Sequence, residues 1–209
     1  MATDTDIRNA ITAERGELAD ILDSLDDADW NQPSLCDGWR VREVVAHITM
    51  PFRYSLPRFA FEMVKARGRF DAMADRRARA DADVMIEREL AAALRDNIGH
   101  PWKPPGGGMA GALSHDVIHG LDFTTPLGIG WVVPEDHMRI IHAGMKPKNI
   151  AFFGVDLDGV ELRADDMDWT YGSGEPLQGR AQDLLLVLCG RTLPPGHLRG
   201  AASERFTRE

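Results

Sequence analysis

Two of the seven histidines in this sequence are spaced for metal binding. His115 and His119 lie four residues apart in a stretch of helical character. Side chains at that spacing project from one face of a helix, about one turn apart. Two imidazole nitrogens placed in this way can bind the same metal ion. The pair by itself is a weak signal, because such a spacing arises readily by chance in a chain with this many histidines.

His47 is the third candidate ligand. It follows Val44, Val45 and Ala46 and precedes Ile48, so a helix there would bury it. An unpaired polar group in a core costs roughly 1–3 kcal/mol, so the ring needs a partner. A metal ion or an ordinary hydrogen bond in the core would satisfy it. The residues alone leave both interpretations open.

The segment from His115 to His119 also resembles the H-E-x-x-H motif of zinc peptidases, in which the acidic residue is the general base. Asp116 would take that role, and Glu135 or His137 would supply the third ligand. Such a peptidase needs an edge strand beside its helix to bind peptide. The sequence shows no good strand before residue 150, so the peptidase hypothesis is disfavoured.

The candidate ligands fall on two predicted helices. Apolar residues recur at three- and four-residue spacings through most of the first two thirds of the chain, which is typical of amphipathic helices. His47 lies in the second predicted helix, and His115 and His119 lie in the fourth. The predicted helices are 7–25, 41–65 with interruptions at Pro51 and Pro57, 83–97, 109–125 and 135–145.

The pattern changes after Pro147. Short apolar runs predict strands at 150–155, 160–164 and 168–172, and a last helix is predicted at 179–189, ending at Gly190. The sequence therefore predicts a mainly α protein. A helical-bundle metal-binding domain would occupy residues 1–146, and a small α+β domain would occupy residues 147–209.

Composition excludes several classes of protein. The net charge of −9 disfavours nucleic-acid binding, which needs clustered cations. The basic cluster Arg76, Arg77 and Arg79 is flanked by acids and is expected to be a solvated helix face or loop. No window approaches the roughly 18 apolar residues of a membrane span, no secretory signal is evident, and Cys36 and Cys189 form no C-x-x-C pair. We expect a cytoplasmic protein with reduced thiols and with neither nucleic acid nor membrane as a partner.

Three segments, in order along the chain, resemble one known family. They are WNQPSLCDGWRVREVVAH at 30–47, HDVIHGLD at 115–122, and LRADDMDWTYGSG at 162–174 followed by GRAQDLLLVLCGR at 179–191. Together they are similar to the mycothiol-dependent maleylpyruvate isomerase family. That family belongs to the DinB-like four-helix metalloprotein superfamily, so the resemblance implies a DinB-like four-helix bundle.

The resemblance implies that His47, His115 and His119 bind a divalent metal ion. Zinc is the expected ion because the isomerase uses it. The isomerase carries a glutamate where this chain has His115, so the site lacks one negative charge, and nickel becomes an alternative. The same departure argues against assuming that maleylpyruvate is the substrate.

The resemblance also implies mycothiol as a thiol cosubstrate and activity as an isomerase or thiol transferase on a small organic acid or electrophile. Asp122 is expected to accept the second N–H of a ligand histidine. Arg191 is the candidate catalytic group for a carboxylate of the substrate or thiol, and Cys36 is expected to be a buried structural thiol. No residues are assigned to thiol binding.

The alternative function is a non-catalytic metal-binding protein of stress response or detoxification that retains the bundle. DinB-like bundles commonly dimerise, so a homodimer is one expectation for the assembly.

Overall fold

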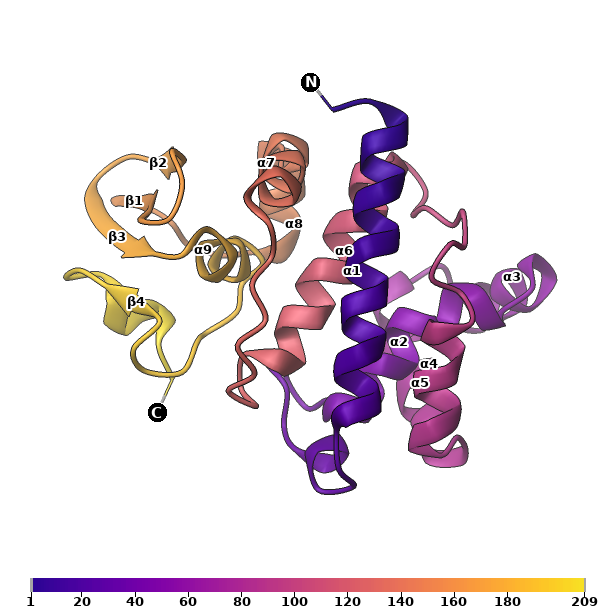
Figure 1. The fold of residues 1–209 in the computed structure, drawn as a ribbon. Coiled ribbons are helices and arrows are strands. Elements are labelled where there is room, and N and C mark those ends of the chain that lie inside the picture. Colours follow the sequence, from indigo (N-terminus) through magenta and orange to yellow (C-terminus); the bar gives the residue numbers. More distant parts are fainter. Residues whose placement is uncertain (1, 209) are drawn as a thin grey trace.

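Four helices of the N-terminal part close into a bundle (Figure 1). The computed structural model describes residues 2–208. The bundle consists of α1 (Asp4–Ser24), α2 (Val41–Arg53), α5 (Glu87–Arg95) and α6 (Gly108–Thr124). α1 and α2 each pack against both α5 and α6, which closes the ring. Leu18, Val44, Leu90 and Leu113 fill its interior and have no exposure to solvent.

Two further helices lie between α2 and α5 along the chain, α3 (Leu56–Lys65) and α4 (Phe70–Val84). The predicted helix at 41–65 is therefore two helices, separated at Tyr54 and Ser55. Ser55 caps α3 by accepting a hydrogen bond from the backbone of Arg58. Pro57 lies in the first turn of α3, where its missing N–H leaves no hydrogen bond unmade.

The sequence prediction missed α4 and placed the following helix wrongly. The predicted helix at 83–97 begins later, as α5, because α4 ends at Val84. α4 is rich in Ala, Arg and Asp, so its apolar periodicity is faint. The basic cluster lies on α4, where each arginine has an acidic partner. The ion pairs are Arg76–Glu62, Arg77–Asp81 and Arg79–Asp75.

The chain continues through α7 (Glu135–Gly144) to α8 (Pro147–Phe153). The predicted strand at 150–155 is wrong, because these residues end the short helix α8 and follow it. Pro147 lies in the first turn, and Gly154 adopts the left-handed conformation at φ 67° that ends the helix. A short apolar run does not by itself distinguish a strand from a buried helix.

A small sheet completes the fold. Its strands are β1 (Val160–Ala164), β2 (Thr170–Gly172), β3 (Glu175–Gly179) and β4 (Leu198–Arg199), in the order β2-β1-β3-β4. β1 pairs parallel to β3 and antiparallel to β2, and β3 pairs antiparallel to β4. β3 and β4 were not predicted. The expected mainly α fold with a small α+β part is confirmed.

α9 (Ala181–Leu188) connects the sheet with the bundle. All eight of its residues are buried, and it contacts β1 and β3 as well as α6 and α7. The side-chain amide of Gln182 donates to the carbonyl of Trp131, and its oxygen accepts from the backbone N–H of Val133. One hydrophobic core runs from α1 to α9, so the division into domains at residues 146 and 147 stays a proposal.

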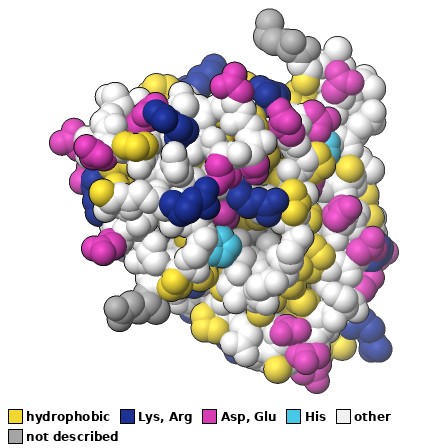
Figure 2. Space-filling model, turned by 60° about the vertical axis from the view of Figure 1, so that its left-hand side comes forward, with side chains coloured by type: hydrophobic (Ala, Val, Ile, Leu, Met, Phe, Trp, Pro, Cys, Tyr) yellow, Lys and Arg dark blue, Asp and Glu magenta, His cyan; other side chains and the backbone are white. Residues whose placement is uncertain are grey.

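The surface carries charges of both signs. On the face drawn in Figure 2, acidic and basic side chains are interspersed with small apolar areas. Among residues 2–208, no helix combines the length and apolar character needed to cross a bilayer.

Gly120 marks the closest approach of α6 to its neighbours. A Cβ placed on Gly120 would lie 2.6 Å from side-chain atoms of both Leu18 and Trp131. We expect Gly120→Ala to lower the free energy of unfolding by about 1–3 kcal/mol, because this core has no room for the methyl group. Urea denaturation measures the change. Gly16→Ala is the control, since its Cβ would meet nothing within 4 Å and should stabilise α1 by about 0.5–1 kcal/mol.

His142 makes the junction between α7 and the sheet sensitive to acid. Its ring stacks on Trp169 with 3.9 Å between ring centroids. Burial lowers the pKa of His142 to about 4, and the neighbouring Ala181 backbone and Asp166 offset only part of this effect. The pKa is lower in the folded than in the unfolded chain, so the contribution to stability is complete above pH 6.5 and is lost as the pH falls toward 4.

Between pH 7 and pH 5, this group should lower the free energy of unfolding by roughly 2 kcal/mol. His142→Phe keeps an aromatic ring stacked on Trp169 and removes the titrating imidazole. Between pH 7 and pH 5, the free energy of unfolding of this variant should therefore fall by less than that of the wild type, and the difference should be this amount. Urea denaturation at both pH values tests this. An equal loss in both proteins would contradict the assignment.

Candidate metal centre

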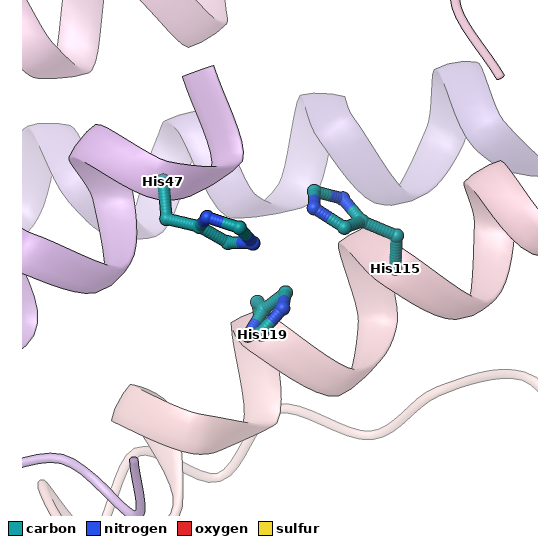
Figure 3. A group of neighbouring side chains, drawn as sticks. All are labelled: His47, His115 and His119. Carbon is teal, nitrogen blue, oxygen red and sulfur yellow. The ribbon is translucent and has the colours of Figure 1, made fainter. Parts of the chain in front are cut away.

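Three imidazoles from two helices converge on one point inside the bundle (Figure 3). His47 comes from the middle of α2, and His115 and His119 come from successive turns of α6. One ring nitrogen from each lies within 4.8 Å of the others. The ring centroids are 4.7 to 5.2 Å apart. The structure thus brings together all three residues that the sequence predicted as metal ligands.

The surroundings of His47 and His119 favour neutral imidazole, the form that binds metal. His47 is 7% exposed. Burial, followed by the proximity of His119 and His115, lowers the pKa of His47 well below its ordinary value. Burial also lowers the pKa of His119, although Asp122 opposes the shift. The buried Nδ1 of His47 has no hydrogen-bond partner among the described residues.

Asp122 holds the His119 ring from behind. The Nδ1 atom of His119 lies 2.9 Å from Oδ2 of Asp122, which leaves Nε2 of the ring facing the other histidines. The carboxylate is fully buried, and Arg191 donates to both of its oxygens, at 2.8 and 2.9 Å. Burial alone would raise the pKa of Asp122, but hydrogen bonds from Arg191 and His119 outweigh this and hold it well below its usual range.

Gly190 turns the chain that carries Arg191. It follows α9 in the left-handed conformation, with φ at 74°, and the next residue points back toward α6. The sequence predicted Arg191 as a group for a carboxylate of the substrate or thiol. In the structure its bidentate partner is the carboxylate of Asp122, and a third donor, Nη1, bonds the carbonyl of Cys189.

Cys36 completes the group around Asp122. Its Sγ donates to Oδ2 of Asp122 at 2.9 Å and accepts from Nη2 of Arg191 at 3.3 Å. Burial and the adjacent charge of Asp122 raise the pKa of Cys36 far above its ordinary value. The thiol therefore stays protonated at neutral pH, as expected of a structural thiol, although its sulfur lies 4.0 Å from Nδ1 of His119.

Asp116 supports His115 in the same manner, which the sequence did not predict. Its Oδ1 lies 3.1 Å from Nδ1 of His115, and its Oδ2 accepts from Nε of Arg15 at 2.7 Å. Both side chains of the ion pair have no exposure to solvent. A carboxylate enclosed in this way is poorly placed to activate water. His137, a candidate third ligand of the peptidase hypothesis, instead bonds Glu14.

Two tryptophans flank the histidines. The Trp39 ring lies 5.3 Å from His47, and the Trp102 ring lies 5.1 Å from His115, between centroids. The indole N–H of Trp39 donates to Asp75 on α4 at 2.8 Å, which fixes that ring. The sequence prediction assigned no role in the site to Trp39. Its place in the motif that ends at His47 is the signal that could have assigned it to the site.

The N-terminal part of the chain matches a known family over residues 11–102. That family is described as the mycothiol maleylpyruvate isomerase N-terminal domain. This part of the chain is similar to that family. The match includes Cys36, Trp39 and His47 and ends before α6, so His115 and His119 lie outside it.

The fold of the whole chain is similar to that of two solved structures. They are the mycothiol-dependent maleylpyruvate isomerase, with a TM-score of 0.54, and a histidine-to-alanine mutant of that enzyme, with a TM-score of 0.53. Each is 14% identical to this chain, and each comparison covers 97% of this chain and 94% of the other. At this identity the likeness establishes the fold. No curated protein sequence matches significantly.

Removing Arg191 should show how strongly the stability of the fold depends on this side chain. We expect Arg191→Met to lower the free energy of unfolding by about 3–5 kcal/mol, because the buried charge of Asp122 would lose the arginine that neutralises it. Adding Asp122→Asn should recover part of the loss. Arg139→Met is the control, since its ion pair with Glu135 is half exposed and should contribute less than about 1 kcal/mol. Urea denaturation of the variants gives the comparison.

Proposed function

We propose that this protein is a divalent-metal-dependent enzyme that uses a small-molecule thiol. Mycothiol is the expected thiol, and the reaction is an isomerisation or thiol transfer on a small organic electrophile. The convergence of His47, His115 and His119 carries the proposal, with a nitrogen of each within 4.8 Å of the others. The family of residues 11–102 supports the choice of thiol.

The donor set fits a divalent ion. Three neutral imidazoles are ligands that zinc, nickel and related ions accept, and a set of three leaves coordination positions open for thiol or substrate. Among the residues that the structure describes, no hydrogen-bond partner meets the buried Nδ1 of His47, so no core hydrogen bond from them holds the ring at that atom. A bound divalent ion would lower the pKa of a thiol that reaches it and so supply a nucleophile.

The protein's own residues would bind and orient the reactants. Asp122 and Asp116 fix the rings of His119 and His115 through their Nδ1 atoms. Cys36 lies outside the three-histidine set, and its Sγ contacts Asp122 and Arg191. Arg191 retains one Nη1 hydrogen beyond its bonds to Asp122, Cys36 and Cys189, and it remains the candidate for a carboxylate of the substrate.

Zinc is the expected ion and nickel the alternative, as the three-imidazole set accepts both. The small organic acid or electrophile is not specified further. We expect the reaction in the cytoplasm, where thiols remain reduced. A homodimer is the expected assembly if the protein follows other DinB-like bundles.

Elemental analysis of purified protein tests the metal site. The wild type should retain about one divalent ion per chain, and His47→Ala, His115→Ala and His119→Ala should each lose most of it. His197→Ala is the control, because His197 bonds Asp183 and lies apart from the three ligands. Full metal occupancy in all three ligand variants would exclude the proposed site.

Calorimetry of the metal-loaded protein with mycothiol separates the two functions. Heat of binding that depends on the metal supports the thiol-dependent enzyme. A protein that holds its metal firmly and binds no thiol would instead be the non-catalytic metal-binding protein.

A further inference from the structure

A fully buried ion pair stands behind His115. Arg15 on α1 and Asp116 on α6 are separated by 101 residues and have no side-chain exposure. Nε of Arg15 donates to Oδ2 of Asp116 at 2.7 Å, and Nη1 of Arg15 donates to the carbonyl of His100 at 2.8 Å. The other oxygen of Asp116, Oδ1, lies 3.1 Å from Nδ1 of His115.

A contribution to the stability of the fold does not by itself explain why Arg15 and Asp116 form a buried ion pair. Burying two charges costs free energy that their attraction often fails to recover, and apolar residues of similar volume commonly serve a core as well. Nη2 of Arg15 is buried and has no hydrogen-bond partner among the described residues. Because burying the charge of Arg15 costs free energy, we infer that this side chain has a role beyond packing α1 against α6.

The contact between Asp116 and His115 indicates what this role is. An imidazole has two ring nitrogens, and the acceptor that one of them meets decides which nitrogen keeps its lone pair. Asp116 accepts at Nδ1 and so leaves Nε2 as the nitrogen with the lone pair. Figure 3 shows the ring of His115 directed toward those of His47 and His119.

We propose that Arg15 and Asp116 are positioning residues of the metal centre, which fix the ring orientation and tautomer of His115. Arg15 holds the rotamer of Asp116, and Asp116 holds the ring. The arrangement repeats that of Arg191, Asp122 and His119 on the next turn of α6. This inference rests on the proposed metal site, since it assigns His115 the role of a ligand.

The affinity for zinc tests the proposal. Asp116→Asn and Arg15→Met are measured in the full chain by competition with a chelator, beside the wild type. We expect each variant to bind zinc about 10- to 100-fold more weakly, because the free ring must be ordered before it can bind. Arg15→Lys, which keeps the charge, is the milder variant if Arg15→Met does not fold.

Arg53 and Asp81 form the matched control. They too are an arginine on one helix and an aspartate on another, 2.7 Å apart and mostly buried. Arg53 also donates to Thr49 and to the carbonyl of Ala46, but neither side chain of the pair hydrogen-bonds a ring of the three histidines. Arg53→Met should lower the melting temperature and leave the affinity for zinc unchanged. The visible spectrum of the cobalt-substituted protein is the second readout. It should shift in Asp116→Asn and not in Arg53→Met, because only the former changes the ligand geometry.

The outcomes separate the two proposals. A wild type that binds no zinc or cobalt would contradict the proposed function itself, and the positioning role with it. A wild type that binds zinc, with Asp116→Asn and the Arg15 variants of equal affinity and unchanged cobalt spectrum, would overturn the positioning role alone. In that case a lower melting temperature would show that the ion pair serves only the fold.

Discussion

Asp122 is a carboxylate without access to solvent, and three separate parts of the chain must meet to neutralise it. His119 comes from its own helix, Cys36 from the loop before α2, and Arg191 from the turn after α9. A buried charge that lacks partners is severely destabilising, so the chain cannot place Asp122 here without also placing the other groups. The position of the small α+β part against the bundle, the course of the loop at Cys36 and the orientation of His119 are therefore linked.

The two carboxylates behind the histidines are each cancelled by an arginine. Asp116 is paired with Arg15 and Asp122 with Arg191, so His115 and His119 receive hydrogen-bond acceptors without any net negative charge being added to the site. A divalent ion held by neutral ligands keeps its full charge. Such an ion attracts anionic groups strongly, and a thiolate or a carboxylate would be favoured in the open positions. A carboxylate ligand in place of His115 would reduce that charge.

The sequence identified the three histidines as candidate metal ligands because each signal lies within one short segment of the chain. His115 and His119 share one helix, and His47 lies in a segment whose flanking residues resemble a known motif. Ion pairs across the fold leave no such signal. Arg15 and Asp116 lie 101 residues apart in the sequence. No motif near either residue predicts that the two side chains form an ion pair. Arg191 was expected to meet a substrate, because only the folded chain shows that Asp122 already occupies its guanidinium.

The misassigned elements have equally local causes. The apolar run at 150–155 has no periodicity long enough to separate strand from helix, and Pro147 and Gly154 determine the outcome as the first turn and the end of α8. α4 escaped prediction because alanine, arginine and aspartate dominate it. Its packing on α2, with which it makes extensive contact, stabilises it more than its intrinsic pattern does.

α9 lies between the sheet and the bundle, and Arg191 follows it directly. The arginine that completes the surroundings of His119 thus comes from a segment 69 residues beyond Asp122 in the chain. Contacts over such separations form late in folding, since the intervening loop must close first. A nascent or truncated chain would have its histidine-bearing helices before it had the arginine. The carboxylate behind His119 would then gain its charged partner only once α9 has packed against the bundle.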